Sequence, residues 1–232
     1  MYETPSDPPR ERRHQKVHRR ILEAATEVIV TSGFDALSMN KLAASLDYTP
    51  GALYRYVPSK DALIASLVAE VVSEVGARIT AAASALPADA PLARVVACAR
   101  AWRAFSEDDP HRFALVAMML AAPRVVMQDE AHVTPAIAAM IEAVRPLARA
   151  LSDAERAGLL GPAPRLAAAE HDRALVLFAA LQGVLLLRKQ AQRAPALVDL
   201  DRLFALACKT LLAGWGASDA ALDPLFPAEP TR

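Results

Sequence analysis

The chain has 232 residues, of which 54% are hydrophobic, and its 26 basic residues are balanced by 26 acidic ones. This length suits one small and one medium domain, each able to bury a hydrophobic core. A net charge of zero argues against a protein that coats nucleic acid unspecifically and against a polybasic membrane binder.

The first ten residues contain no apolar signal segment, and the longest apolar run extends only from Ala174 to Leu187. A membrane span needs about 20 apolar residues, so no transmembrane segment and no membrane partner are expected. The two cysteines, Cys98 and Cys208, are far apart and are interpreted as reduced core thiols of a cytoplasmic protein.

No stretch alternates as a strand does, and only eight residues are glycine, so the predicted fold class is all-α. In chain order, the sequence predicts helices at residues 13–32, 39–46, 50–56, 59–84, 91–106, 110–121, 130–150, 167–192 and 199–214.

The start of the chain is strongly basic. Residues 10–20, here called the basic arm, contain six cations and one acid: Arg10, Glu11, Arg12, Arg13, Lys16, Arg19 and Arg20. Taken alone, such a run is usually a solvated leader. His14 and His18 have an i, i+4 spacing that suits a metal, but their basic neighbours favour an arm that contacts phosphates.

The first helix carries an apolar stripe at helical spacing and ends at Gly33, a usual C-terminal cap. Ser38 is the expected N-cap of a short second helix. The buried stripe of that second helix is predicted to be Met39, Leu42, Ala43 and Leu46.

A third helix begins shortly afterwards, with Thr49 as N-cap and Pro50 at the first helical position. Leu53 is its main inward-facing residue. The remaining side chains are predicted to lie on or near exposed faces, namely Tyr48, Thr49, Pro50, Gly51, Tyr54 and Arg55. Two short helices joined in this way form a helix-turn-helix that can enter a major groove, and Asn40 faces outward from its first helix.

Ser59 is predicted to cap the next helix, near whose start Lys60 can anchor a phosphate. In the alternative interpretation, Lys60 and Asp61 are merely solvated while Tyr54 and Tyr56 pack inside.

The segment "ILEAATEVIVTSGFDALSMNKLAASLDYTPGALYRYVPSKDAL" resembles the TetR (tetracycline repressor) family of bacterial transcription factors. The resemblance implies that Tyr54 and Lys60 contact phosphates, that Ser38 is the cap that donates to the DNA backbone, and that Tyr48 to Gly51 form the base-reading end. Asp47 replaces the usual turn glycine, and Tyr48 replaces a small apolar residue. Asp tolerates a left-handed backbone, so the turn is expected to persist.

The resemblance also implies a helical regulatory domain with a ligand pocket and a dimer interface. The expected regions are a disordered leader (1–12), a helix-turn-helix DNA-binding domain (13–66), a ligand-binding and dimerisation domain (67–216) and a Pro-rich tail (217–232). The apolar stretches "ALVLFAALQGVLLL" and "LFALACKTLLAGWG" are expected to form the homodimer interface, with an ordinary monomeric core as the alternative.

Aromatic and methionine side chains mark the expected ligand site, although such stripes are more often core. The predicted lining residues are Trp102, Phe105, Phe113, Met118, Met119, Phe178 and Gln182. Gln182 is the most informative because it interrupts an apolar helix. Arg103, His111 and Arg112 are further polar groups able to orient a ligand.

The sequence therefore predicts a regulator that binds operator DNA and releases it on binding a small, mostly apolar effector, without cofactor or metal. An activator of the same fold remains an alternative. An enzyme is disfavoured because His111, His132 and His171 are scattered and no nucleophile has a recognisable setting. A non-specific nucleic-acid binder is disfavoured by the neutral net charge.

Overall fold

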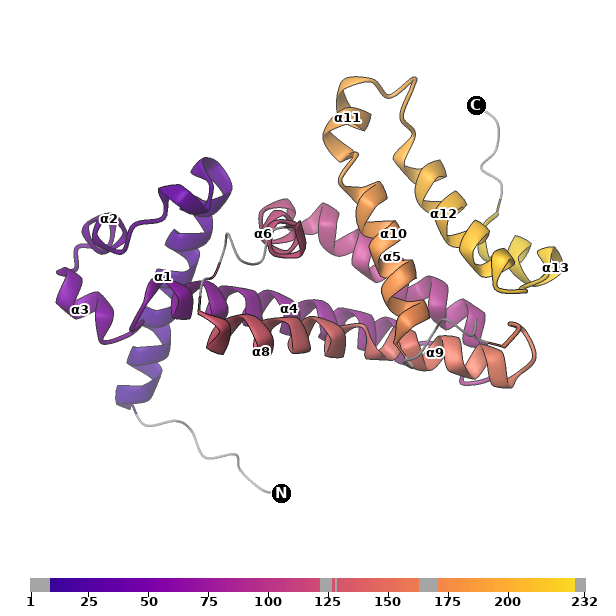
Figure 1. Ribbon diagram of the computed structural model, residues 1–232, viewed down its shortest axis with the longest axis horizontal. Helices are drawn as coiled ribbons and strands as arrows, with labels where there is room; N and C mark the ends of the chain where they lie inside the picture. The colour runs from indigo at the N-terminus through magenta and orange to yellow at the C-terminus, as the bar shows by residue number, and fades with distance from the viewer. Residues whose placement is uncertain (1–8, 122–126, 128, 163–170, 228–232) are drawn as a thin grey trace. The chain divides into compact units, whose positions relative to one another are not determined.

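A computed structural model of the chain describes residues 9–121, 127, 129–162 and 171–227. The described elements are helices joined by turns and loops, and none of these residues lies in a strand, which confirms the all-α prediction (Figure 1). Contacts between residues divide the chain into two compact units. Unit 1 comprises Met1–Val71 with His111–Ile137, and unit 2 comprises Val72–Pro110 with Ala138–Arg232.

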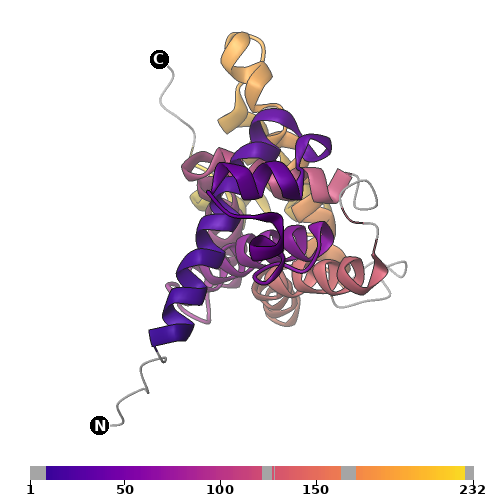
Figure 2. The same cartoon turned by 90° about the vertical axis from the view of Figure 1, so that its left-hand side faces the viewer.

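Unit 1 contains the helices that the sequence assigns to the helix-turn-helix, and Figure 2 turns them toward the viewer. Its elements are α1 (Pro9–Ser32), η1 (Phe34–Ala36), α2 (Met39–Ser45), α3 (Pro50–Tyr54), the first part of α4 (Lys60–Ser84), α6 (Pro110–Ala121) and the first part of α8 (Glu130–Ala143). The fully buried side chains of its core include Ile21, Ile29, Leu42, Leu53, Leu63 and Ile64. The core therefore fixes α2 and α3 against the longer helices of the same unit.

Unit 2 contains the rest of α4 and α8 together with the later helices. These are α5 (Pro91–Asp108), α9 (Arg145–Arg156), α10 (Asp172–Leu185), α11 (Arg188–Arg193), α12 (Leu200–Gly214), α13 (Asp219–Leu222) and η2 (Asp223–Leu225). Helix α5 packs on α9, and α10 packs on both α12 and α9. Phe105, Leu177 and Leu181 are among the largest side chains that this packing buries completely.

Several element bounds differ from the predicted ones. Helix α1 starts at Pro9, so residues 9–12 belong to it and not to a disordered leader. Proline suits a helix start because its missing N–H is not needed there. The sequence predicts a single helix over residues 130–150, but the structure has two helices there. The helix is interrupted at Val144, and α9 begins at Arg145, which Pro146 follows.

The C-terminal elements differ as well. The predicted helix 167–192 is divided at Leu186 and Leu187 into α10 and α11, and residues 163–170 lie outside the described ones. Part of the expected tail is folded, since α13 buries Leu222 completely. An Arg100 guanidinium N–H also donates to the Leu225 carbonyl at 2.8 Å.

Both cysteines are buried and unpaired. Burial raises the pKa of the Cys98 thiol to about 11 and that of the Cys208 thiol to about 12. Both thiols therefore stay protonated at neutral pH, as expected of side chains that only fill a core.

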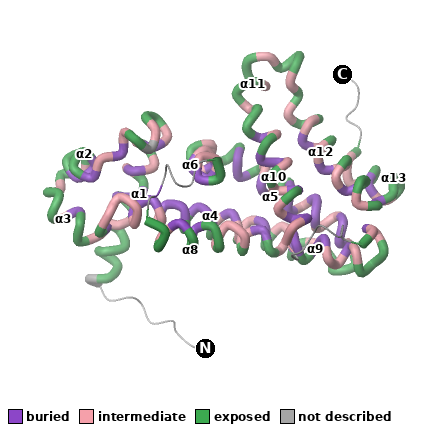
Figure 3. Tube along the Cα trace, in the orientation of Figure 1, coloured by how far each residue is buried: buried purple, intermediate pink, exposed green. Residues whose placement is uncertain are grey.

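The stretch Asp172–Arg193, which holds α10 and α11, is long and apolar enough by length and composition to cross a bilayer. This is weak support for a membrane span, because the core helix of a soluble protein passes the same test. Only 28% of its apolar window is buried, and Figure 3 shows exposed positions along α10 and α12. The large exposed apolar residues here are Val176, Leu186, Leu187 and Leu206, and we call them the apolar face.

The end of α12 meets the loop after α9 through two glycines. Gly216 has a φ of +103°, and a Cβ atom on it would lie 2.9 Å from the Gly161 backbone nitrogen. The Gly161 N–H donates to the Trp215 carbonyl at 2.8 Å, so the two backbones cannot separate without losing that bond. A side chain at residue 216 is opposed both by its backbone angle and by its neighbour.

We predict that Gly216→Ala lowers the free energy of unfolding by about 1–3 kcal/mol, because it imposes backbone strain and a backbone clash. Gly214→Ala is the matched control, since nothing lies within 4 Å of a Cβ there. Urea denaturation of both variants measures the difference. Equal stabilities would contradict the close approach of the two glycines.

Candidate nucleic-acid interface

Helix α2 is positioned by its N-terminal residue and by its buried face. Ser38 occupies the N-cap position, and its carbonyl accepts the Leu42 N–H at 2.9 Å. The Ser38 side chain makes no capping hydrogen bond, so the predicted cap is correct in position but not in its side-chain contact. Met39, Leu42 and Ala43 are buried as predicted, which leaves Asn40 exposed on the outer side.

The turn between α2 and α3 has the predicted left-handed residue. Asp47 has a φ of 60°, and the next N–H, from Tyr48, donates to the Ala43 carbonyl at 2.9 Å. An aspartate tolerates this conformation better than most residues, so the replacement of the expected glycine leaves the turn intact.

Helix α3 is short and has one buried residue, Leu53, whose side chain is 0% exposed. Thr49 caps it, since its Oγ1 accepts the Ala52 N–H at 3.2 Å, and Pro50 is its first residue. With Leu53 turned inward, the other side of the helix faces solvent. Exposed residues there are Thr49, Pro50, Gly51, Tyr54 and Arg55, and Tyr54 keeps 44% of its surface.

Lys60 is the first residue of α4, and the helix start is capped by Ser59, whose Oγ accepts the Ala62 N–H at 3.0 Å. The neighbouring Asp61 is not merely solvated, because its carboxylate accepts the Asp129 N–H at 2.7 Å. The exposure of Tyr54 likewise contradicts the alternative in which Tyr54 packs inside. Lys60 itself is half-buried at a helix N-terminus, where free N–H groups favour the binding of an anion.

The structure adds an aromatic connection that the sequence did not predict. The ring centroids of His14 and Tyr56 are 4.8 Å apart, and those of Tyr56 and Tyr48 are 6.2 Å apart. These contacts join the basic arm to Tyr48, which lies just before the N-cap of α3. They also give the unusual Tyr48 a packing partner. The spacing of His14 and His18 was the available sequence signal, but it points to a metal or a phosphate and not to a tyrosine.

The charges of the basic arm are accessible. Its exposed cations are Arg12, Arg13, Lys16, Arg19 and Arg20. These cations lie on α1, in the same unit as α2 and α3. The unit thus combines exposed polar side chains, a helix N-terminus with a lysine, and a run of cations, which together suit a nucleic-acid backbone.

The predicted ligand-lining residues are divided between the two units. Phe113, Met118 and Met119 belong to unit 1, where Phe113 and Met119 are buried and Met118 is partly buried. Trp102, Phe105, Phe178 and Gln182 belong to unit 2. The structure therefore does not bring all seven together within one unit.

In unit 2 the aromatic residues do cluster. The Trp102 ring lies 5.6 Å from that of Phe105 and 4.9 Å from that of Phe178. Gln182 is one helical turn after Phe178 on α10 and only 6% exposed. Neither its amide nitrogen nor its amide oxygen has a hydrogen-bond partner. A buried amide without hydrogen bonds destabilises the fold, and its donor and acceptor could both hydrogen-bond a ligand.

The other predicted polar groups have different roles. Arg103 forms ion pairs with Glu107, at 2.8 Å, and with Asp201. Arg112 forms an ion pair with Glu70 at 3.2 Å, and His111 is exposed. The two arginines therefore connect helices within their own units. Among the residues that the structure describes, no group of three or more His, Cys, Asp or Glu side chains could hold a metal ion.

Part of the chain is similar to known proteins. Residues 21–67 match the family model described as "Bacterial regulatory proteins, tetR family". A relative from Mycobacterium tuberculosis, the HTH-type transcriptional regulator Rv1816, is 29% identical over 102 residues. That match covers 44% of either chain, so the chain spans less than half the length of this relative.

Solved structures match over a longer range. The putative regulatory protein SCO4313 is 28% identical and has a TM-score of 0.67, with 89% of this chain and 100% of the other covered. SmeT in complex with triclosan is 24% identical and has a TM-score of 0.65, with 94% of this chain and 100% of the other covered. SmeT is the repressor of the Stenotrophomonas maltophilia multidrug efflux pump SmeDEF. At that identity the likeness to SmeT concerns the fold alone.

Proposed function

We propose that the chain belongs to the tetR family of bacterial regulatory proteins, whose family model residues 21–67 match, and that it is a sequence-specific, DNA-binding transcriptional regulator. We propose further that it is a repressor, which leaves its operator when a small, mostly apolar effector binds. The observation that carries this proposal is the orientation of α3, which buries Leu53 and exposes its polar and aromatic side.

Each DNA contact has a physical basis in that orientation. Thr49, Pro50 and Gly51, together with Tyr48, form the end of α3 that enters the major groove and reads base edges. The remaining contacts position the protein on the phosphate backbone or beside it: Ser38, Asn40, Tyr54, Arg55 and Lys60. The cations of the basic arm add electrostatic attraction that does not depend on sequence.

The enzyme alternative is set aside because the relatives that the chain resembles are transcriptional regulators. Repression is the sign of regulation proposed here, and SmeT is an example of a repressor with this fold. A regulator of bacterial genes acts on DNA in the cytoplasm, which agrees with two buried and unpaired cysteines. Deleting the gene and measuring transcripts of the operator-linked genes tests whether the protein represses or activates. Repression predicts that the transcript levels rise after the deletion.

The apolar face supports a homodimer. On α10 and its C-cap Leu186, the residues Val176, Ala179, Gly183 and Leu186 are exposed and recur at helical spacing, so they share one side of the helix. Leu206 adds a 57% exposed side chain on α12, which packs against α10. A second copy would cover these residues with an identical surface. The two reading helices of such a dimer would address major grooves about 34–36 Å apart.

Gln182 supports an effector site in unit 2. A mostly apolar molecule bearing one hydrogen-bonding group would pack on Trp102, Phe105 and Phe178 and would satisfy the buried amide. Phe113, Met118 and Met119 belong to unit 1, so the site proposed here does not include them. The structure of SmeT with triclosan supports a small-molecule site in this fold. A coupling free energy of about 1–3 kcal/mol would change operator affinity about 5- to 150-fold.

The first test concerns Lys60 as a contact that does not choose sequence. We predict that Lys60→Ala weakens binding to selected and random duplexes alike and reduces the slope of log K against log salt by about one. Lys189→Ala, on exposed α11, is the control and leaves both unchanged. Tyr48→Ala alters base preference instead. If Lys60→Ala changes the base preference but leaves the slope of log K against log salt unaltered, Lys60 reads bases instead.

The second test concerns the dimer. Val176→Glu and Leu206→Glu place charge on the apolar face, so we expect folded monomers with weak operator binding. Leu185→Glu is a contrasting variant, because Leu185 is 1% exposed and a charge there disrupts the core of the protein itself. Light scattering gives the mass, and circular dichroism shows whether the helices persist. A wild-type protein that is monomeric at micromolar concentration contradicts the interface.

The third test separates effector binding from folding. Gln182→Leu removes an unsatisfied buried amide, so the free energy of unfolding is expected to rise by about 1 kcal/mol. The same change should weaken any effector that hydrogen-bonds residue 182, while operator affinity without effector stays nearly unchanged. Thermal denaturation and operator release by triclosan and related phenols measure the two effects. Loss of dimerisation or operator binding in Gln182→Leu, with no compound releasing wild-type operator, would assign Gln182 a structural role.

A further inference from the structure

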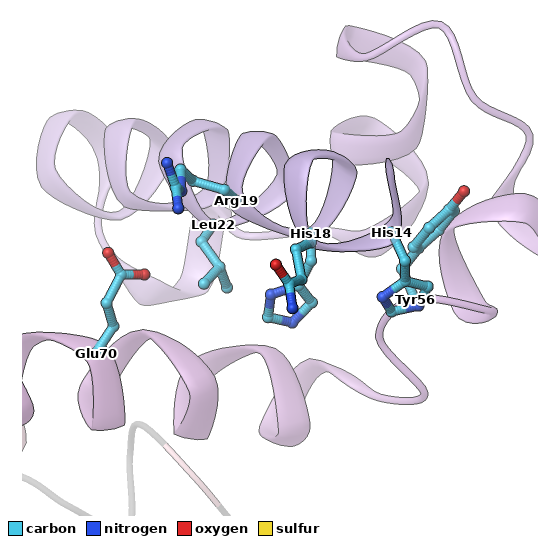
Figure 4. A pocket seen from close by; sticks show the side chains of 7 residues that line it. His14, His18, Arg19, Leu22, Tyr56 and Glu70 are labelled. Carbon is cyan, nitrogen blue, oxygen red and sulfur yellow. The ribbon is translucent and has the colours of Figure 1, made fainter. Parts of the chain in front are cut away.

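Unit 1 contains a cavity of about 540 Å³ that is separate from the proposed effector site in unit 2. Its walls come from three places in the chain. Helix α1 contributes His14, His18, Arg19 and Leu22, the segment after α3 contributes Tyr56, and α4 contributes Glu70. Figure 4 shows His14 beside Tyr56, with Arg19 and Glu70 farther along the two helices. The volume lies in the range usual for small-molecule sites.

One end of the cavity offers flat rings. His14 and Tyr56 lie with centroids 4.8 Å apart and ring planes inclined by 36°. His14 is exposed and Tyr56 is half-buried, so the pair presents ring surface to the cavity without closing it. Leu22, which is 5% exposed, adds an apolar wall. This end suits a planar aromatic group, which gains both apolar contact and ring stacking.

The other end of the cavity offers a cation. Arg19 is exposed, and its guanidinium makes no ion pair with any residue that the structure describes. The acid nearest in this wall, Glu70, is already paired with Arg112 at 3.2 Å. The rest of the basic arm adds positive potential, and His18 supplies a hydrogen-bonding imidazole. A guanidinium fork matches the two oxygens of a carboxylate, so this end suits an organic acid.

The distance between the two ends selects among aromatic acids. His14 and Arg19 are five residues apart on one helix, which corresponds to about 7.5 Å along its axis. A carboxylate attached directly to a ring matches this axial separation less well. A ring joined to its carboxylate by a flexible spacer of a few atoms is long enough.

We propose that this cavity binds a small aromatic carboxylate with a spacer between ring and acid. The ring lies against His14 and Tyr56, and the carboxylate is held by Arg19 with help from His18. Such a ligand contacts Tyr56, whose ring lies near that of Tyr48 at the reading end. It also neutralises the charge of Arg19 in the basic arm. If the proposed operator function holds, on which this last step rests, occupancy weakens operator binding from within unit 1.

Direct binding without DNA tests the site. The probe is 4-(2-naphthyl)butanoate, measured by equilibrium dialysis against the full chain, with its primary amide and 2-naphthoate for comparison. The acid is expected to bind about 5- to 10-fold more tightly than the amide, because the amide lacks the charge that Arg19 recognises. The short 2-naphthoate is expected to bind more weakly than the long acid.

Matched variants locate the bound probe. Arg19→Gln is expected to weaken the acid about 5- to 10-fold, whereas Arg20→Gln, equally exposed but not lining the cavity, leaves it unchanged. His14→Gln is expected to weaken it about 2- to 10-fold through lost stacking. Gln182→Leu leaves it unchanged, because that residue lies in unit 2.

Four results would each overturn the proposal: no binding at millimolar probe, equal binding of acid and amide, equal effects of Arg19→Gln and Arg20→Gln, or loss of binding in Gln182→Leu. The last would place the probe in the effector site. A probe that binds as expected to a protein that selects no duplex from a random pool would support the cavity while rejecting the proposed operator function.

Discussion

The burial of one side chain, Leu53, determines how the reading helix faces its surroundings. Helix α3 has five residues, too few to be stable alone, so its orientation depends on this contact with the core and on the Thr49 cap. Once Leu53 is inside, the helical period places Gly51, Tyr54 and Arg55 outside. The left-handed Asp47 then fixes the direction in which α3 leaves α2. The proposed DNA contacts follow from these local constraints.

Two features of unit 2 oppose stability in the isolated chain, and each of the two proposed partners would relieve one of them. The apolar face leaves Val176 and Leu206 more than half exposed, which a second subunit would cover. Gln182 has a buried amide without hydrogen bonds, which an effector would satisfy. Natural proteins retain such local costs chiefly where function needs them. Val176 of the apolar face and Gln182 lie on the same helix, α10, so binding of the proposed effector and of the proposed partner would both act on that element.

The sequence predicted the features that depend on residues close together in the chain, such as caps and turns. It missed the features that depend on contacts between distant residues. The caps at Thr49 and Ser59, the Gly33 stop and the Asp47 turn all depend on residues a few positions away, and the structure has each of them. The break before α9 was missed although Pro146 was visible, because Pro135 is tolerated inside α8 and proline alone does not decide a boundary. The pairs of Arg103 with Asp201 and of Arg112 with Glu70, and the division of the seven predicted lining residues between the units, depend on tertiary contacts that no local pattern contains.

Charge distribution explains how a neutral chain can still approach DNA. The cations of the basic arm are concentrated on α1, while many acids elsewhere pair within their units, as Glu74 and Asp108 do with Arg78. Neutrality limits attraction to arbitrary duplex, and the arm restores attraction only where α3 also faces the groove. The ring contacts from His14 through Tyr56 to Tyr48 tie these two elements together. Through these side chains, a change at the arm would affect the proposed reading end without any change in the fold of unit 1.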